Sequence, residues 1–304
     1  MTIDGCLPVV ATPFAADESV DVGGLREIVE LNIGCGVDAL TCFGLASELY
    51  KLDETDRGLI LDTLMTATQG RVPVIVGCEH SGNRAAAHRC AQAAQFGASA
   101  VMLLPPSFTI PAPSSIRDYF LRCADACDVS VIVQDAPAWT GVELPVDLLV
   151  ELHEEDERIN TVKLEAPPIS EKSRLLREAG MSVVSGYGAV HLYEDVTLGS
   201  IDGFMPGCAF PEVMVRLWSR ATSEDRGDFA ELYERILPLL IAELTDLDTF
   251  IEVQKRALVM RGLLSSTTCR EPHRAVAADR WRYLDRLIEN ALALGKKVAS
   301  DDIV

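Results

Sequence analysis

Short apolar runs alternate with longer amphipathic segments from the N-terminus to about residue 220. The runs are apolar throughout, which is typical of strands in a parallel sheet that is covered on both faces. The predicted strands are residues 6–11, 38–43, 73–78, 100–104, 130–134, 160–165, 182–186 and 203–208. Apolar residues recur at helical spacing, and glycines mark several helix ends, in residues 24–33, 54–68, 84–96, 116–126, 145–155, 170–179, 190–198 and 212–221. Eight strand–helix repeats predict an α/β fold, a (β/α)8 TIM barrel.

From about residue 225 the pattern becomes helical only, and three helices are predicted. They cover residues 229–244, 249–264 and 274–294. We therefore predict a barrel over residues 1–224 and a C-terminal three-helix extension, packed on the barrel, over residues 225–304. A doubly wound open sheet is the alternative, but no G-x-G-x-x-G run follows the first predicted strand.

Composition narrows the function classes. The 304-residue chain is 48% apolar and 24% charged, with a formal net charge of −19, which argues against binding to nucleic acid or an anionic membrane. Nine cysteines without a CxxC spacing suggest reduced thiols in a cytoplasmic protein. The N-terminus lacks the features of a signal peptide, and no apolar run approaches the roughly 20 residues that a membrane span needs. We expect a soluble, cytoplasmic protein.

Lys163 lies in the middle of a short apolar predicted strand, where a buried cation is costly. The other five lysines fall in helical or polar contexts that predict access to water: Lys51, Lys172, Lys255, Lys296 and Lys297. Lys163 could form a buried ion pair with Glu165, which shares its strand face. It could instead be an amine that attacks a ketone and forms a Schiff base.

In such barrels the carboxyl ends of the strands carry the site. The polar and small residues at these ends are the candidate substrate-binding residues: Ala46, Ser47, Glu48, Gln134, Asp135, Gly186, Met205 and Gly207. Ser47 and neighbouring backbone N–H groups could bind a carboxylate, although Ser47 and Glu48 could equally be N-caps of the next helix. Gln134 and Asp135 could orient a substrate hydroxyl or simply cap the strand end.

Several runs resemble the dihydrodipicolinate synthase/N-acetylneuraminate lyase superfamily, the class I Schiff-base barrels. They are residues 5–14, 70–77, 97–100 with 105–106, 162–163 and 185–186. The resemblance implies that Lys163 condenses with the keto group of pyruvate or another 2-keto acid, so that no separate cofactor is needed. It also implies a homotetramer built from dimers.

The sequence departs from this family's pattern at positions that matter for chemistry. The usual Gly-Thr-Thr-Gly-Glu is Gly-Leu-Ala-Ser-Glu at residues 44–48, and Gln134 replaces a proton-relay tyrosine. Phe108 stands for the second relay tyrosine, and Trp139 for the arginine that grips the semialdehyde carboxylate. We therefore do not expect the dihydrodipicolinate synthase reaction itself.

A branch of the family, the L-2-keto-3-deoxyarabonate dehydratases, is more similar. The similarity lies in Ser-Glu at residues 47–48, Gln-Asp-Ala-Pro at 134–137, Lys-Leu-Glu at 163–165 and Met-Pro-Gly-Cys-Ala-Phe-Pro at 205–211, whereas Leu45 and Tyr187 depart from it. The resemblance implies dehydration of a 2-keto-3-deoxy sugar acid through a Lys163 iminium. Glu165 is the candidate general acid or base, because it shares the strand face of Lys163; the alternative is that it is only the ion-pair partner of Lys163.

Two other functions stay open from the sequence. One is a pyruvate-releasing aldolase that uses the same iminium, and the other is a barrel that binds a small acid without turnover. A metal site is less favoured, because the five histidines show no ligand spacing and His80 alone follows a predicted strand. A phosphate site near Gly186, Gly188 and Gly207 lacks a supporting basic residue.

Overall fold

A computed structural model of the chain describes residues 3–109, 111–166 and 169–301. The chain divides into two compact units, each built from two segments. The first unit consists of Met1–Gly5 and Pro73–Met205, and the second of Cys6–Val72 and Pro206–Val304. The predicted division at residue 224 falls inside the second unit, so the separation into barrel and extension stays a prediction.

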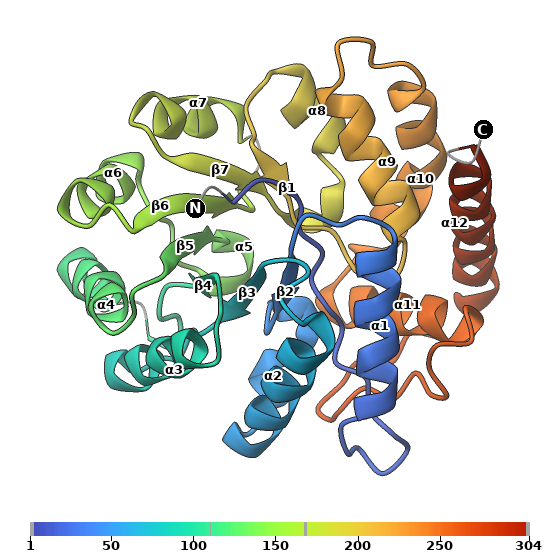
Figure 1. Ribbon diagram of the computed structural model, residues 1–304, viewed down its shortest axis with the longest axis horizontal. Coiled ribbons are helices and arrows are strands. Elements are labelled where there is room, and N and C mark those ends of the chain that lie inside the picture. The colour runs from blue at the N-terminus through green and yellow to red at the C-terminus, as the bar shows by residue number, and fades with distance from the viewer. Residues whose placement is uncertain (1–2, 110, 167–168, 302–304) are drawn as a thin grey trace. The chain divides into compact units, whose positions relative to one another are not determined.

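The first unit holds six parallel strands, and hydrogen-bonded neighbours follow chain order. The strands are β3 Val74–Gly77, β4 Ala100–Leu103, β5 Ser130–Asp135, β6 Ile159–Leu164, β7 Ser182–Ser185 and β8 Gly203–Phe204. Its helices are α3 Asn83–Gln95, α4 Pro113–Asp125, α5 Pro137–Thr140, α6 Val146–Glu155, α7 Ser170–Glu178, η3 Tyr187–Ala189 and α8 Leu192–Thr197. Figure 1 shows α3, α4, α6 and α7 along the outer side of this sheet.

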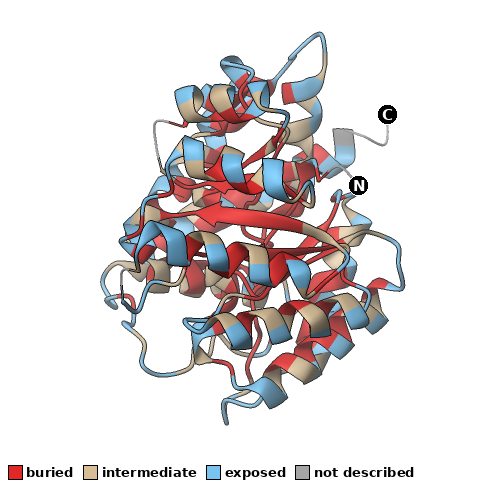
Figure 2. Ribbon diagram, turned by 90° about the vertical axis from the view of Figure 1, so that its left-hand side faces the viewer, coloured by how far each residue is buried: buried red, intermediate tan, exposed pale blue. Residues whose placement is uncertain are grey.

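Burial explains the unbroken apolar runs of these strands. Every residue of β3 and β4 is buried, and so are residues 131–135 of β5. In Figure 2 the strands are red along their length, whereas the helices carry red on one side and pale blue on the other. Side chains that alternate between two covered faces must be apolar on both, which is the pattern read from the sequence.

Asp195, on α8 of the first unit, is a buried carboxyl group that does not belong to the predicted site. Asp195 of α8 accepts a 2.6 Å hydrogen bond from the Ser185 hydroxyl. Burial raises the pKa of Asp195 to about 6. Its pKa in the unfolded chain is about 3.9. Between these values the folded protein holds a proton that the unfolded chain has lost.

We expect Asp195→Asn to remove a pH dependence of stability. The pKa of Asp195 is higher in the folded state, so the free energy of unfolding of the wild type should fall as pH rises from about 4 to about 6. The loss should approach about 3 kcal/mol, at about 1.4 kcal/mol per pH unit. Asparagine keeps an acceptor for Ser185 and does not titrate. Urea unfolding of both proteins at pH 4 and pH 7 checks this; equal differences at the two pH values would contradict it.

The second unit contains one short strand and most of the remaining helices. Its elements are β2 Leu40–Cys42, α1 Val22–Gly34, η1 Leu45–Ser47, η2 Leu49–Lys51, α2 Glu54–Thr68, α9 Pro211–Thr222, α10 Phe229–Glu243, α11 Leu247–Met260 and α12 Trp281–Asp301. Strand β1, Gly5–Cys6, lies where the two units join in the sequence. Val9 forms isolated parallel bridges to Thr41, in the middle of β2, and to Gly207.

Two strands are shorter than the sequence predicts. The runs 6–11 and 203–208 were expected to be strands, but β1 ends at Cys6 and β8 at Phe204. Pro8 and Pro206 follow these ends, and proline has no N–H to donate to a neighbouring strand.

The third C-terminal helix begins later than predicted. The helix expected over residues 274–294 is α12, Trp281–Asp301. The backbone N–H groups of Arg274 and Val276 donate to Asp248 and Glu252 of α11 at 3.1 and 2.9 Å. Carboxylates of a neighbouring helix therefore satisfy donors at the place where we expected a first helical turn.

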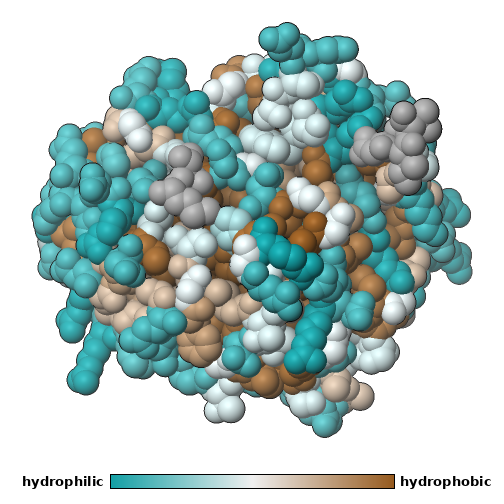
Figure 3. Space-filling model, viewed as in Figure 1, coloured by the Kyte–Doolittle hydropathy of each residue, from teal (hydrophilic) through white to brown (hydrophobic). Residues whose placement is uncertain are grey.

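The face shown in Figure 3 is dominated by hydrophilic residues, with hydrophobic ones in smaller groups. Among the helices that the structure describes, none combines the length and the apolar character needed to cross a membrane.

Candidate active site

Lys163 and Glu165 form a buried ion pair at the carboxyl end of β6. The Lys163 Nζ lies 2.9 Å from Glu165 Oε1, and the two residues are 5% and 6% exposed. Residues two apart on a strand share a face, which brings this amine and this carboxylate together. The ion pair that we considered from the sequence is present. It leaves the Schiff-base hypothesis open, because a carboxylate beside an amine can also receive its proton.

Gln134 joins this pair from the neighbouring strand. In the β5–β6 register Gln134 is the partner of Lys163, and its Nε2 donates to Glu165 Oε1 at 2.8 Å. One carboxylate oxygen therefore receives two donors, one of them charged. The three residues are buried and form a polar cluster among apolar strand residues.

Asp135 is not part of this cluster. It follows Gln134 on β5, so its side chain points to the opposite face, and its Oδ2 lies 2.6 Å from the Nζ of Lys172 on α7. Lys172 also donates to the Leu144 carbonyl. Burial raises the pKa of Asp135 in spite of this lysine. Asp135 Oδ1 has no hydrogen-bond partner among the described residues.

Gly186, directly after β7, lies against Glu165. A Cβ atom at this position would be 2.7 Å from Glu165 Oε1 and even closer to its Cγ. The absence of a side chain at residue 186 is therefore what leaves room for the Glu165 carboxylate.

Met205, after β8, is buried and donates its backbone N–H to the Ser185 carbonyl at 2.8 Å.

We expect Gly186→Ala to lower turnover about 100-fold, since a displacement of about 1 Å in a catalytic group can cost that much. The added methyl would push the Glu165 carboxylate away from Lys163 and Gln134. Gly58→Ala on α2 is the matched control, because nothing lies within 4 Å of a Cβ there. Steady-state kinetics of both variants measure the effect. An active Gly186→Ala enzyme would show that the position of Glu165 is unimportant.

The Ser47 segment lies in the second unit and is held by its own contacts. Ser47 Oγ donates to the Val10 carbonyl at 2.6 Å, and the Thr12 hydroxyl donates to the Ser47 carbonyl at 2.7 Å. Ala46, in the middle of η1, is half-buried. Ser47 is not an N-cap, because it lies inside η1, and Asp53 caps α2. Glu48 does occupy the N-cap position of η2, but its side chain makes no capping hydrogen bond there.

Glu48 and Lys255 differ most from the sequence-based interpretation. We expected five lysines other than Lys163 to reach water, but Lys255 of α11 is 0% exposed, less than Lys163 itself. Its Nζ contacts Glu48 Oε1, and Lys51 Nζ lies 3.1 Å from Glu48 Oε2. Glu48, predicted to bind substrate, is thus fully enclosed by cations of its own unit. Gln254, the residue before Lys255, lies directly against Gly207.

Sequence reasoning missed Gln254 and Lys255 because they fall in an amphipathic helix far along the chain. The available signal was weak, because residues 250–259 contain four polar residues and nothing in the sequence distinguishes Gln254 and Lys255 from Glu252 and Arg256.

Several residues that differ from the pattern of the resembled family lie in short helices and loops that the sequence did not predict. Trp139 is on α5 and partly exposed, and Phe108, between β4 and α4, is 89% exposed. Tyr187 begins η3, with its ring centroid 5.9 Å from that of His191. The hydroxyl of buried Tyr119 accepts a 3.3 Å hydrogen bond from the backbone N–H of His80.

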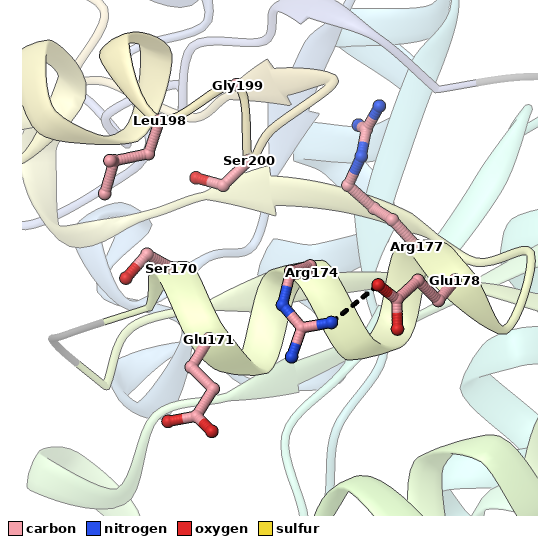
Figure 4. A pocket seen from close by; sticks show the side chains of 8 residues that line it. All are labelled: Ser170, Glu171, Arg174, Arg177, Glu178, Leu198, Gly199 and Ser200. Atoms are coloured by element: carbon pink, nitrogen blue, oxygen red, sulfur yellow. Dashed lines mark hydrogen bonds and ion pairs between the residues drawn. The ribbon is translucent and has the colours of Figure 1, made fainter.

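Metal and anion sites find little support. Within the described ranges, no group of three or more His, Cys, Asp or Glu residues could hold a metal ion. Seven of the nine cysteines are buried and none is in a disulfide. A surface cavity of about 590 Å³ lies along α7 (Figure 4). Its arginines are already paired, Arg174 with Glu178 and Arg177 with Asp202, so the cavity does not concentrate positive charge.

Comparison with known proteins places the chain in a family. The sequence profile of the Dihydrodipicolinate synthetase family matches residues 2–291. An L-2-keto-3-deoxyarabonate dehydratase from Azospirillum brasilense is 31% identical over 277 residues, covering 88% of each chain. The "Probable 2-dehydro-3-deoxy-D-pentonate aldolase" of Escherichia coli (strain K12) is 25% identical over 275 residues, covering 88% of this chain and 90% of that one.

A solved structure extends the comparison to the fold. The crystal structure of a "putative dihydrodipicolinate synthetase" from Pseudomonas aeruginosa superposes with a TM-score of 0.89 at 26% identity, covering 95% of this chain and all of that one. The chain is therefore an α/β protein of the (β/α)8 barrel class, as the strand–helix repeats predicted. It belongs to the Dihydrodipicolinate synthetase family, whose members are lyases and aldolases, and the predicted enzyme class is confirmed.

Proposed function

We propose that this enzyme dehydrates a 2-keto-3-deoxy sugar acid of the L-2-keto-3-deoxyarabonate type through an iminium on Lys163. The observation that carries the proposal is the buried cluster of Lys163, Glu165 and Gln134. The similarity to a dehydratase over 88% of both chains supports the choice of reaction. The proposed substrate is a small acid, which fits the glycines and small residues at the strand ends.

The chemistry begins at the ion pair. Glu165 accepts a proton from the Lys163 ammonium, and the free amine attacks the C2 ketone. Glu165 then returns the proton to the departing hydroxyl, so that water leaves, an iminium forms and the carboxylate is free again. The iminium withdraws electrons from the C2–C3 bond, so that a C3 proton can leave and an enamine forms. The electron pair of the enamine then expels the C4 hydroxyl, which leaves as water after taking up a proton.

Glu165 is the group we assign to the proton transfers, because its Oε1 is 2.9 Å from the reacting nitrogen. The Gln134 amide keeps this carboxylate oriented and has the donor geometry to read a substrate hydroxyl. No separate cofactor is required, since the iminium itself acts as the electron sink.

Within the unit that holds Lys163, we assign substrate contacts to the backbone at Gly186 and Met205. The contacts expected from Ala46, Ser47 and Gly207 stay predictions. Asp135 and Glu48 are less well supported as substrate-binding residues, because a lysine already contacts each carboxylate. A homotetramer and a cytoplasmic location remain predictions from the resemblance and the composition.

A pyruvate-releasing aldolase is the second candidate, favoured by the similarity to a protein named as a pentonate aldolase. The same iminium would break the C3–C4 bond instead of the C4–O bond. The two reactions differ in their products: dehydration keeps the carbon chain intact, whereas the aldolase releases pyruvate and an aldehyde.

Product analysis decides between them. The enzyme is incubated with a panel of 2-keto-3-deoxy pentonates and hexonates of both configurations, and the products are identified by NMR and mass spectrometry. We expect a dehydrated keto acid without pyruvate. Release of pyruvate would replace the proposed reaction by the aldolase, and absence of any product from the panel would contradict both.

A further inference from the structure

Four cysteines of the first unit form a cluster where α3 packs against α4. They are Cys78, directly after β3, Cys90 on α3, Cys123 on α4 and Cys127, two residues after the end of α4. The Cys90 thiol forms hydrogen bonds with the other three sulfur atoms, so it is the centre of the cluster. Thiols in contact across two helices are placed for oxidation to a disulfide, a reaction that needs both sulfur atoms close together.

Cys127 is the member of this cysteine cluster that solvent can reach. Its exposed fraction is 7%, whereas Cys78, Cys90 and Cys123 are 0% exposed. Cys127 lines a surface cavity of about 540 Å³ together with Arg158 and residues of α3. A small solute in this cavity therefore meets Cys127 first, while protein covers the other three thiols.

The surroundings of Cys127 favour its thiolate form. The Cys90 thiol and the backbone N–H of Val129 donate hydrogen bonds to it, and Arg158 adds a nearby positive charge. Together they lower the pKa of the Cys127 thiol below its ordinary value, against the effects of burial and of the Asp128 charge. The Arg158 guanidinium also donates to the Cys127 carbonyl, which holds the cation beside this residue. The thiolate is the nucleophilic form of cysteine, so Cys127 is the activated thiol of the cluster.

Two thiols of the second unit provide an internal comparison. Cys35 and Cys269 are half-buried and thus more exposed than Cys127. Burial raises the pKa of Cys35 to about 11 and that of Cys269 to about 12. Exposure alone predicts that Cys35 and Cys269 react before Cys127, whereas thiolate character predicts the opposite order.

We propose that Cys127, beside Arg158, is a peroxide-reactive thiol and that Cys90 is its resolving partner, so that oxidation joins α3 to the end of α4 through a disulfide. This site lies within the first unit and does not depend on the proposed function.

The oxidation takes two steps with hydrogen peroxide as the oxidant. The Cys127 thiolate attacks one peroxide oxygen; the O–O bond breaks, an S–O bond forms, and the released hydroxide takes up a proton to become water. The Cys90 sulfur then attacks the sulfur of the Cys127 sulfenic acid. The S–O bond breaks, the disulfide forms, and the departing hydroxide takes the Cys90 proton and leaves as a second water. The two thiols lose two electrons, and the peroxide is reduced to water.

The test exposes the full-length, freshly reduced protein to hydrogen peroxide at pH 7. Remaining thiols are alkylated at successive times, and the peptides are mapped by mass spectrometry. We expect a peptide pair linked through Cys90 and Cys127, and oxidation of Cys127 at least about tenfold faster than that of Cys35 or Cys269. Faster oxidation of either half-buried thiol would overturn the proposal, and so would a Cys127 that stays reduced or is oxidised without a link to Cys90.

Cys90→Ser separates the two steps. Serine keeps a hydroxyl donor for Cys127 but cannot form a disulfide, so the Cys127 sulfenic acid should accumulate and be captured by dimedone. Cys123→Ser is the matched control, because Cys123 lies one turn before Cys127 on the same side of the cluster, and the link from Cys127 to Cys90 should still form. A disulfide that persists in Cys90→Ser and is lost in Cys123→Ser would overturn the role given to Cys90. Mapping of the wild type decides the question if a variant does not fold.

Arg158→Met tests the contribution of the cation. The rate at which iodoacetamide alkylates Cys127 is measured against pH, and the midpoint of this profile should move to higher pH in the variant. Arg117→Met is the control, because Arg117 lies on α4 but pairs with Glu151 at 2.8 Å, and its profile should match that of the wild type. An unchanged midpoint in folded Arg158→Met would overturn the role given to Arg158.

Discussion

Lys163→Ala is expected to abolish covalent capture of 2-keto acids and to lower turnover by at least about a thousandfold, because loss of a covalent nucleophile removes the whole reaction path. Borohydride reduction of the wild type with pyruvate should add one reduced adduct, and peptide mapping should place it on Lys163. The variant should show no adduct at any pyruvate concentration. Three other lysines also contact carboxylates and provide an internal comparison, because we expect no adduct on them: Lys51, Lys172 and Lys255.

Lys163→Arg is the matched variant. Removing one partner of a buried ion pair costs about 3–5 kcal/mol, so alanine will lower the melting temperature. Arginine keeps a cation for Glu165 but stays protonated and cannot form an iminium. A folded Lys163→Arg protein without adduct or turnover would assign the loss to chemistry. If either variant retains turnover or forms an adduct on another residue, the Schiff base on Lys163 is the wrong mechanism.

The order of the elements could be predicted because each strand and helix leaves a local pattern. All eight predicted strands overlap an observed strand, although the first does so only at Cys6, and the helix expected over residues 54–68 is α2, Glu54–Thr68. The predicted ends of elements were wrong where a contact with a distant part of the chain determines the end. At residues 274–280 the local sequence permits a helix, but the carboxylates of Asp248 and Glu252 bind the N–H groups that would begin it.

The candidate site could be predicted only as far as strand geometry reaches. The contact between Lys163 and Glu165 follows from their spacing on one strand, and Gln134 follows from the order of the strands. Asp135 was grouped with Gln134 because both end β5, although alternation sends it to the other face, where Lys172 binds it. The environment of Lys255 could not be read at all, because its partner Glu48 lies 207 residues away.

Gln134 stands where the resemblance to the family implies a proton-relay tyrosine, and this difference limits what the cluster can do. An amide can orient a carboxylate and donate to a hydroxyl, but it cannot pass a proton as a tyrosine can. Proton transfer must then fall to the group that Gln134 orients. Glu165, with both Lys163 and Gln134 as donors, is the only titratable partner that the structure gives to Lys163 within the described residues.

Glu165→Gln is therefore expected to lower turnover by about 10²–10⁴-fold, the usual contribution of a general acid or base. Glutamine retains the size of the side chain and can still accept from Gln134, but it cannot take a proton. Exchange of the pyruvate methyl protons in D2O provides a direct readout, because it requires reversible loss of the C3 proton from the iminium. We expect exchange to be lost while an adduct on Lys163 can still be trapped on long incubation.

Measuring trapping and exchange together in Glu165→Gln distinguishes a role of Glu165 in proton transfer from a purely structural ion pair. If Glu165 only stabilised the Lys163 ammonium, its neutralisation would make the amine easier to deprotonate, and both trapping and exchange would proceed at least as fast as in the wild type. Glu171→Gln, which removes one exposed carboxylate from α7, is the control for the change in net charge and should leave exchange unaffected. Exchange that persists in Glu165→Gln would move the base to another group, and the role of Glu165 would reduce to holding the lysine in place.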